Sequence, residues 1–184
     1  MPRSAARARR DIVAAICGAL VLAFGPSTVA QALGDDTLKS IAILDFELVD
    51  DQHELSPATV EHDRLRVARL QLATEFAQRR LYRVVDVSPA ADVMAKQRAA
   101  APLHACNGCE LDIARIVHAD RVLVGWVQKV SNLILNINIQ IEDATSGDVL
   151  LNKSVDLRGN TDESWRRGVS YLVQSMVDKG QANR

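Results

Sequence analysis

The stretch RVLVGWVQKVSNLILNINIQIEDATSGDVLLNKSVDL, residues 121–157, decides the fold. Between residues 133 and 142, leucine and isoleucine alternate with mostly polar residues, a period of two that buries one face of a β-strand and exposes the other. Residues 122–126 carry no polar side chain apart from the indole N–H, which predicts a central strand covered on both faces. A turn at Thr145-Ser146-Gly147-Asp148 leads into a returning strand at residues 149–157. The stretch is therefore predicted to be a β-meander.

Residues 41–49 and 82–87 predict two earlier strands. Helices are predicted between the strands and after the meander, starting near Ser56, Ser88, Cys106 and Asn160. A strand, a helix and a second strand in succession favour a parallel pair with a right-handed crossover. The predicted fold is mixed α/β, with a sheet of about five strands in the order β-α-β-α-α-β-β-β-α and helices on the sheet faces.

The amino terminus has the pattern of a secretory signal peptide over residues 1–32. Four arginines precede the apolar run of residues 12–24, and Ala30-Gln31-Ala32 supplies a cleavage site after Ala32. The run is shorter than the roughly 20 residues that span a bilayer as a helix. No linker or repeat divides the remainder, so residues 33–180 are expected to be a single periplasmic domain without a stable membrane span.

The charge balance excludes a nucleic-acid-binding surface. Of 22 basic and 23 acidic residues, the leader holds four arginines and Asp11, which leaves 18 basic and 22 acidic residues without a basic stripe. A small molecule or another periplasmic protein is the expected partner.

Cys106 and Cys109 form the one spacing with recognisable chemistry. A CxxC pair at a helix start can exchange disulfides, and the same pair with His104 and His118 could bind zinc. Haem attachment requires histidine directly after the second cysteine, where Glu110 stands. In an exported protein a structural disulfide between the two is favoured, and no metal or cofactor is expected.

Other patterns for catalysis or metal binding are weak. Residues 50–54 hold three carboxylates and His53, but without the ligand spacing of a calcium loop. Ser131 and Ser164 lie in no nucleophile elbow. The chain is predicted not to be an enzyme.

Topology predicts the working surface. If the early strands run parallel, their carboxyl ends share an edge with the end of the last strand, and ligands of α/β sheets favour such edges. The loops there hold polar residues at 50–53 and Ser88, and helix starts can receive anions. The predicted recognition patch consists of Gln128, Lys129, Ser131, Asn132, Arg158, Asn160, Asp162, Glu163, Trp165 and Arg166. Lys129 and Arg158 are expected to be exposed cations whose removal costs little stability.

Four strings carry a resemblance to a known family: AILDFELVD, CNGCELDIAR, GWVQKVSNLILNIN and RGNTDESWRRG. Together they resemble a family of uncharacterised, secreted bacterial proteins, often encoded near PQQ-dependent alcohol dehydrogenases, over about residues 38–178. The order of elements is also similar to the amino-terminal domain of TolB and the periplasmic module of the curli-secretion channel subunit, which implies binding and assembly, although fold does not fix function.

Two functions follow as hypotheses. The first is a non-catalytic periplasmic binding or adaptor protein, accessory to a PQQ-dependent alcohol-oxidation system. The alternative is a thiol–disulfide oxidoreductase or maturation factor that uses Cys106 and Cys109.

Overall fold

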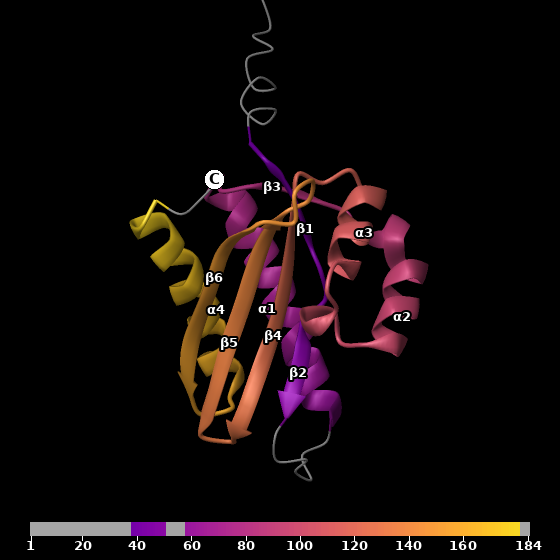
Figure 1. Ribbon diagram of the computed structural model, residues 1–184. Coiled ribbons are helices and arrows are strands. Elements are labelled where there is room, and N and C mark those ends of the chain that lie inside the picture. Colours follow the sequence, from indigo (N-terminus) through magenta and orange to yellow (C-terminus); the bar gives the residue numbers. More distant parts are fainter. Residues whose placement is uncertain (1–37, 51–57, 181–184) are drawn as a thin grey trace, which may run out of the picture. The chain divides into compact units, whose positions relative to one another are not determined.

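Six strands form one mixed sheet in the computed structural model, which describes residues 38–50 and 58–180 (Figure 1). The elements in chain order are β1 (Ser40–Ile43), β2 (Glu47–Asp50), α1 (Ala58–Gln78), β3 (Arg83–Val85), η1 (Ser88–Ala90), α2 (Ala91–Ala100), η2 (Leu103–Ala105), α3 (Cys109–Ile116), β4 (Arg121–Ser131), β5 (Ile134–Asp143), β6 (Val149–Arg158) and α4 (Asp162–Asp178). Here η denotes a short 3₁₀ helix.

The strand order β3-β1-β4-β5-β6 confirms the predicted topology. β1 is parallel to both β3 and β4, while β4, β5 and β6 form the antiparallel meander. β4 is the central strand, because β1 and β2 pair with one side of it and β5 with the other. The apolar residues on both faces of its first half therefore have elements to pack against on either side.

Residues 41–49 were predicted as one strand, but the structure divides them into β1 and β2. Both pair in parallel with β4, at Ile43↔Leu123 and then at Glu47↔Trp126. Four steps along one strand thus match three along the other, so one extra residue bulges out of the pairing. The Phe46 ring, in the bulged segment, lies against Gly125, where an added Cβ would be 2.2 Å from the ring. Alternation alone does not reveal such a bulge.

We expect Gly125→Ala to destabilise the domain by about 1–3 kcal/mol, the usual cost of overpacking a filled core. The Phe46 ring is 6% exposed and rigid, so the strand or the ring has to shift to accept a methyl group. Chemical denaturation measures the change in the free energy of unfolding. The double variant with Phe46→Leu, which shortens the opposing side chain, should recover part of the loss. Wild-type stability of the single variant would contradict the close approach.

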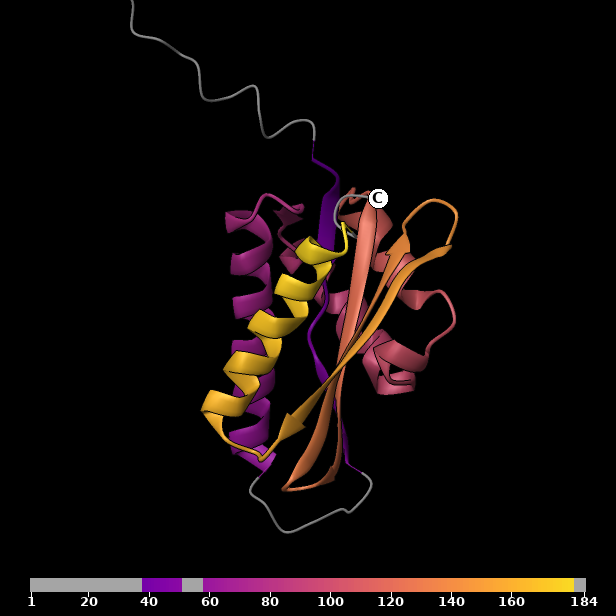
Figure 2. The same cartoon turned by 90° about the vertical axis from the view of Figure 1, so that its left-hand side faces the viewer.

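Two helix layers cover the sheet, and they differ in extent (Figure 2). α1 and α4, the latter with Leu172 among others, pack on one face against buried residues of β1, β4, β5 and β6, including Ile137 and Ile139. Partly buried Leu48 of β2 and Val84 of β3 pack against the same cluster. α2 and α3 pack on the other face, against a smaller cluster around β1 and the first half of β4. The polar rows of β5 and β6 on that second face are not covered by this cluster. This explains why β5 alternates in burial while the first half of β4 does not.

Leu133, predicted to begin the buried row of the fourth strand, is 74% exposed. Ser131 pairs with Ile134 across the β4–β5 connection, so Asn132 and Leu133 form a two-residue turn at the hairpin tip. A turn residue has no place on either face of the sheet. The buried row therefore starts at Leu135.

Candidate functional site

α1 and α4 lie side by side on one face of the sheet (Figure 2). Polar side chains join the two helices. The Gln71 amide on α1 donates to the Arg166 carbonyl at 3.0 Å and to Ser170 Oγ at 2.9 Å on α4. Ser170 Oγ donates in turn to Glu75 Oε1 at 2.7 Å. These side-chain bonds fix the spacing of the two helices.

A buried ion pair ties the amino-terminal end of α1 to the sheet. Lys129 on β4 is fully buried, and its Nζ lies 2.8 Å from Glu61 Oε1 on α1 and 3.4 Å from Asp50 Oδ2 on β2. Glu61 is itself only 3% exposed. The hydrogen bond to Glu61 raises the pKa of Lys129 above its ordinary value, against the opposing effect of burial. The lysine is therefore charged and structural.

Asn160 connects this ion pair to the start of α4. Its Nδ2 donates to Glu61 Oε1 at 3.0 Å, and its Oδ1 accepts from Trp165 Nε1 at 2.9 Å and from Arg64 at 3.1 Å. Arg64 Nε also donates to Asp162 Oδ1 at 2.7 Å. The α4 amino terminus is closed by Thr161, whose side chain accepts from the Ser164 N–H. Ion pairs and hydrogen bonds thus connect the start of α4 to α1 and β4 around Asn160.

Above this network the two helices leave a groove of about 280 Å³. Its walls are apolar and its rim is charged, and the lining residues are Val60, Asp63, Arg64, Val67, Ala68, Gln71, Asp162, Trp165 and Arg166. Val67 is 51% exposed, and Leu70 beside it on α1 is 47% exposed. Val67 therefore presents apolar surface inside the groove, and Leu70 adds exposed apolar surface on the same helix.

The structure divides the predicted recognition patch. Asp162, Trp165 and Arg166 line the groove, with Lys129 and Asn160 beneath it, and Asn132 reaches Asn160 at 3.4 Å. Glu163 pairs with Arg166 at 2.6 Å, which lowers the pKa of the Glu163 carboxyl through that hydrogen bond.

The remaining members of the patch lie apart from the groove. Ser131 Oγ accepts from the Leu133 N–H inside the hairpin turn, and Arg158 is exposed beside hollows along β6. Gln128 is half-buried on β4. Of the other predicted loop residues, Asp51 and His53 lie outside the described residues. Ser88 follows β3, which pairs with residues 40–42 of β1. Lys129 instead pairs with the end of β2, so β3 ends far from it.

Lys129 corrects the expectation of an exposed cation in a surface loop. β4 extends through Ser131, and alternation turns Lys129 toward α1, where Glu61 receives it. A glutamate on a helix is usually found on the solvated face, but Glu61 is only 3% exposed. Its spacing of four and seven residues from Leu65 and Ala68 puts it on the buried face, and that signal could have identified it.

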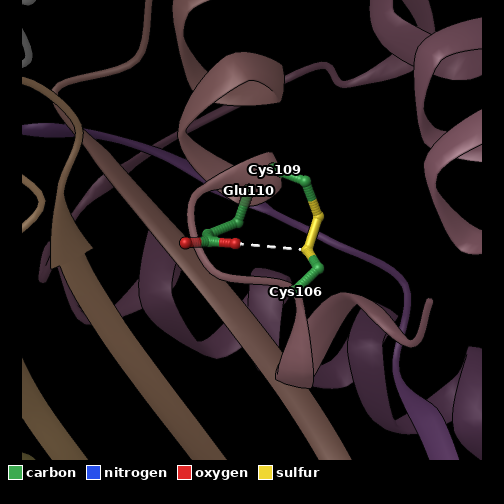
Figure 3. Close-up of side chains that lie close together, drawn as sticks. All are labelled: Cys106, Cys109 and Glu110. Atoms are coloured by element: carbon green, nitrogen blue, oxygen red, sulfur yellow. Dashed lines mark hydrogen bonds between the residues drawn. A yellow bond between two sulfur atoms is a disulfide. The ribbon is translucent and has the colours of Figure 1, made fainter. Parts of the chain in front are cut away.

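On the opposite face of the sheet, Cys106 and Cys109 are joined by a disulfide, with their Cα atoms 5.8 Å apart (Figure 3). Glu110 follows directly and turns inward: its Oε2 lies 3.4 Å from Cys106 Sγ, and its Oε1 accepts from the Gly108 N–H at 3.0 Å. Cys106, Cys109 and Glu110 form a compact group of metal-ligating side chains. With the sulfurs joined to each other, this group offers no thiolate to a metal.

The histidines considered as zinc ligands with this pair are placed differently. His104 Nδ1 lies 2.6 Å from Glu47 Oε2, and its ring stacks on Trp126 with centroids 5.3 Å apart. His118 is exposed at the turn after α3, with a positive φ of 52°. Glu110, not a histidine, is the side chain that approaches the sulfurs.

Comparison with known proteins identifies a family and a fold. The DUF3280 family, described as "Protein of unknown function (DUF2380)", matches residues 39–177. No curated protein matches the sequence. Among the residues that the structure describes, no helix has the length and apolar character needed to cross a membrane.

Several solved structures are similar. Lipoprotein GNA1162 from Neisseria meningitidis is 17% identical with a TM-score of 0.50, over 77% of this chain and 95% of that chain. The PelC dodecamer from Paraburkholderia phytofirmans is 14% identical with a TM-score of 0.47, over 79% and 91%. TolB from Acinetobacter baumannii is 11% identical with a TM-score of 0.46, over 78% of this chain and 29% of TolB. At these identities a similarity concerns the fold alone.

Proposed function

We propose that this chain, which belongs to the DUF3280 family of proteins of unknown function, is an exported periplasmic binding or adaptor protein whose recognition surface is non-catalytic. The observation that carries the proposal is the groove between α1 and α4. Its apolar walls are open to a partner, while its charged rim residues pair with neighbouring side chains, Arg64 with Asp162 and Arg166 with Glu163. Such a surface is suited to binding a partner, because these ion pairs and hydrogen bonds hold the groove in one shape.

A segment of another protein suits the groove better than a small molecule does. Its volume of about 280 Å³ falls just below the range of about 300–1,000 Å³ typical of pockets that enclose small ligands. One or two apolar side chains of a helix could enter between α1 and α4 and also cover Val67 and Leu70, as in helix-in-groove recognition. Arg64, Asp162 and Arg166 on the rim would then contact polar residues of either charge that flank the inserted side chains.

Export and a physiological partner belong to the same proposal. The leader pattern of residues 1–32 supports export. The resemblance to proteins encoded near PQQ-dependent alcohol dehydrogenases suggests that the partner belongs to such an alcohol-oxidation system. A dehydrogenase subunit of that system that offers an amphipathic helix is the partner we propose.

Val67→Glu tests the groove. The full chain and two variants are used to capture proteins from the periplasm of the native host, and each captured protein is then purified and titrated. We expect Val67→Glu to weaken binding at least tenfold, because a carboxylate would be buried against apolar walls. The matched control is Val149→Glu, since Val149 is 54% exposed at the start of β6, away from the groove.

Equal binding by the wild type and both variants would place the working surface elsewhere and contradict the proposal. Equal loss in both variants would do the same, because the groove would then have no special role. The identity of the captured protein tests the PQQ link separately: a partner unrelated to alcohol oxidation would remove that part of the proposal alone.

The alternative function, thiol–disulfide exchange, would use a different surface. Cys106 and Cys109 pack with the cluster under α2 and α3, on the other face of the sheet from the groove. One observation favours this alternative: a buried carboxyl group lies beside one of the two sulfurs. The two functions can therefore coexist in one chain.

A further inference from the structure

The side chain of Glu110 is placed in a way that a purely structural disulfide does not require. It belongs to the first turn of α3, where a carboxylate normally faces water, yet it is only 6% exposed. A cavity of about 90 Å³ lies beside it and is lined in part by Cys106, Glu110 and Glu142. Burying a carboxyl group has a free-energy cost that an apolar residue would avoid. Costly buried acids beside a reactive group are often functional.

The surroundings of Glu110 favour its protonated form. Burial raises the pKa of the Glu110 carboxyl, and the charge of Glu142, which is 5% exposed on β5, raises it further. The backbone N–H groups of Glu110 itself and of Gly108 act in the opposite direction and lower this pKa. The other titratable group lining the cavity is His104, whose Nδ1 is engaged by Glu47. A carboxyl group whose protonated form is favoured by its surroundings therefore lies 3.4 Å from Cys106 Sγ.

The two sulfurs differ in their surroundings. Cys109 is the first residue of α3, where the free N–H groups and the helix dipole stabilise a thiolate. Cys106 lies outside the helix and is the sulfur that Glu110 approaches (Figure 3). One sulfur is thus suited to leave as an anion and the other to leave with a proton.

We propose that Cys106–Cys109 is an exchange-active disulfide that oxidises dithiols, and that Glu110 is the acid that protonates Cys106. This inference rests on the alternative function and names its proton donor and substrate class. A thiolate of the substrate attacks Cys109 Sγ, the bond between the two cysteine sulfurs breaks, and Cys106 leaves with the proton of Glu110. The second substrate thiol loses its proton to water and attacks the substrate sulfur of the mixed disulfide, which expels Cys109 as a thiolate.

The electrons and protons of these reaction steps balance. Two electrons pass from the substrate dithiol to the cysteine pair, the substrate becomes a disulfide, and its two protons go to water. Glu110 ends as a carboxylate and recovers a proton from solvent.

The test measures how fast the disulfide of the folded full chain is reduced by dithiothreitol, a dithiol probe, from mildly acidic to mildly alkaline pH. Samples are quenched with acid, alkylated and weighed by mass spectrometry, and each rate constant is divided by the thiolate concentration of the probe. In the wild type this normalised constant should fall as pH rises through the pKa of Glu110. In Glu110→Gln it should be lower by about 10²-fold, the scale of general acid catalysis, and independent of pH.

Two further variants keep the result interpretable. Asp112→Asn removes an exposed carboxylate of the same helix, which pairs with Arg115, and should leave the profile unchanged. Glu142→Gln removes the neighbouring charge without touching Glu110, so the fall in rate should move to lower pH. This second variant tests the proposal even if Glu110→Gln does not fold.

Each contrary result has a separate meaning. A wild-type profile in Glu110→Gln, or an unmoved profile in Glu142→Gln, overturns the role of Glu110 while exchange itself survives. A disulfide that stays intact in the folded wild type overturns both the exchange function and this inference. Neither result bears on the groove between α1 and α4, which the capture experiment tests.

Discussion

Lys129→Ala is expected to destabilise the domain by about 3–5 kcal/mol, the range observed when one partner of a buried ion pair is removed. The alanine leaves Glu61, which is 3% exposed, without its nearest cation. Asn160 still donates to Glu61 Oε1, but one amide hydrogen bond does not neutralise a buried carboxylate. Urea denaturation followed by circular dichroism measures the change.

The double variant Lys129→Met with Glu61→Gln provides the control. It removes both charges, retains most of the buried volume, and keeps an acceptor for Asn160, so most of the lost stability should return. Arg158→Ala, the change of an exposed cation at the end of β6, should remain within about 0.5 kcal/mol of the wild type. A loss below about 1 kcal/mol for Lys129→Ala would show that the ion pair with Glu61 contributes little to the stability of the folded protein.

Alkaline pH should affect the wild type and the double variant differently. The pKa of Lys129 is raised in the folded protein above the ordinary value of 10.5, so the native state holds this proton more tightly than the unfolded state does. The resulting stabilisation is complete below the unfolded pKa and is lost as pH rises through the folded pKa. The double variant, which lacks the lysine, should not show this part of the alkaline decline.

The sheet could be predicted from the sequence because its signals are local. The alternation of residues 135–141 and the apolar first half of β4 each follow from which faces of a strand are covered. The division between β1 and β2 could not be predicted, since it depends on the Phe46 ring meeting Gly125 across two strands. A bulge set by a contact between distant residues leaves no periodic trace in either segment.

The candidate site was predictable in its location and not in its chemistry. The edge where β4 and β6 end follows from strand direction, and Asn160, Asp162 and Trp165 gather there. Whether Lys129 faces solvent or Glu61 depends on how far β4 extends and on how α1 packs against it. Both are features of the tertiary structure that the local sequence does not reveal. In the sequence, Glu110 only excludes haem attachment, because nothing in its spacing indicates that its side chain turns inward to Cys106.

Trp165→Ala is expected to lower the free energy of unfolding by about 3–5 kcal/mol, the usual cost of removing a large buried aromatic side chain. The indole is 3% exposed, packs in the core under α4, and forms part of the groove wall. Its loss would open the groove into the core and remove the donor to Asn160 Oδ1. Binding of the captured partner should weaken together with stability.

Trp165→Phe separates the two contributions. It keeps an aromatic ring in the core and removes the N–H donor, while Arg64 still donates to Asn160 Oδ1 at 3.1 Å. Loss of the hydrogen bond should therefore lower the free energy of unfolding by about 1 kcal/mol. The smaller ring leaves a cavity, which lowers it further. Thermal and chemical denaturation of both variants measure the loss of stability, and titration of the partner measures the loss of binding. If Trp165→Phe loses as much stability as Trp165→Ala, the hydrogen bond to Asn160 holds α4 on the sheet. If instead Trp165→Ala binds the partner with unchanged affinity while remaining folded, the groove wall is not part of the recognition surface.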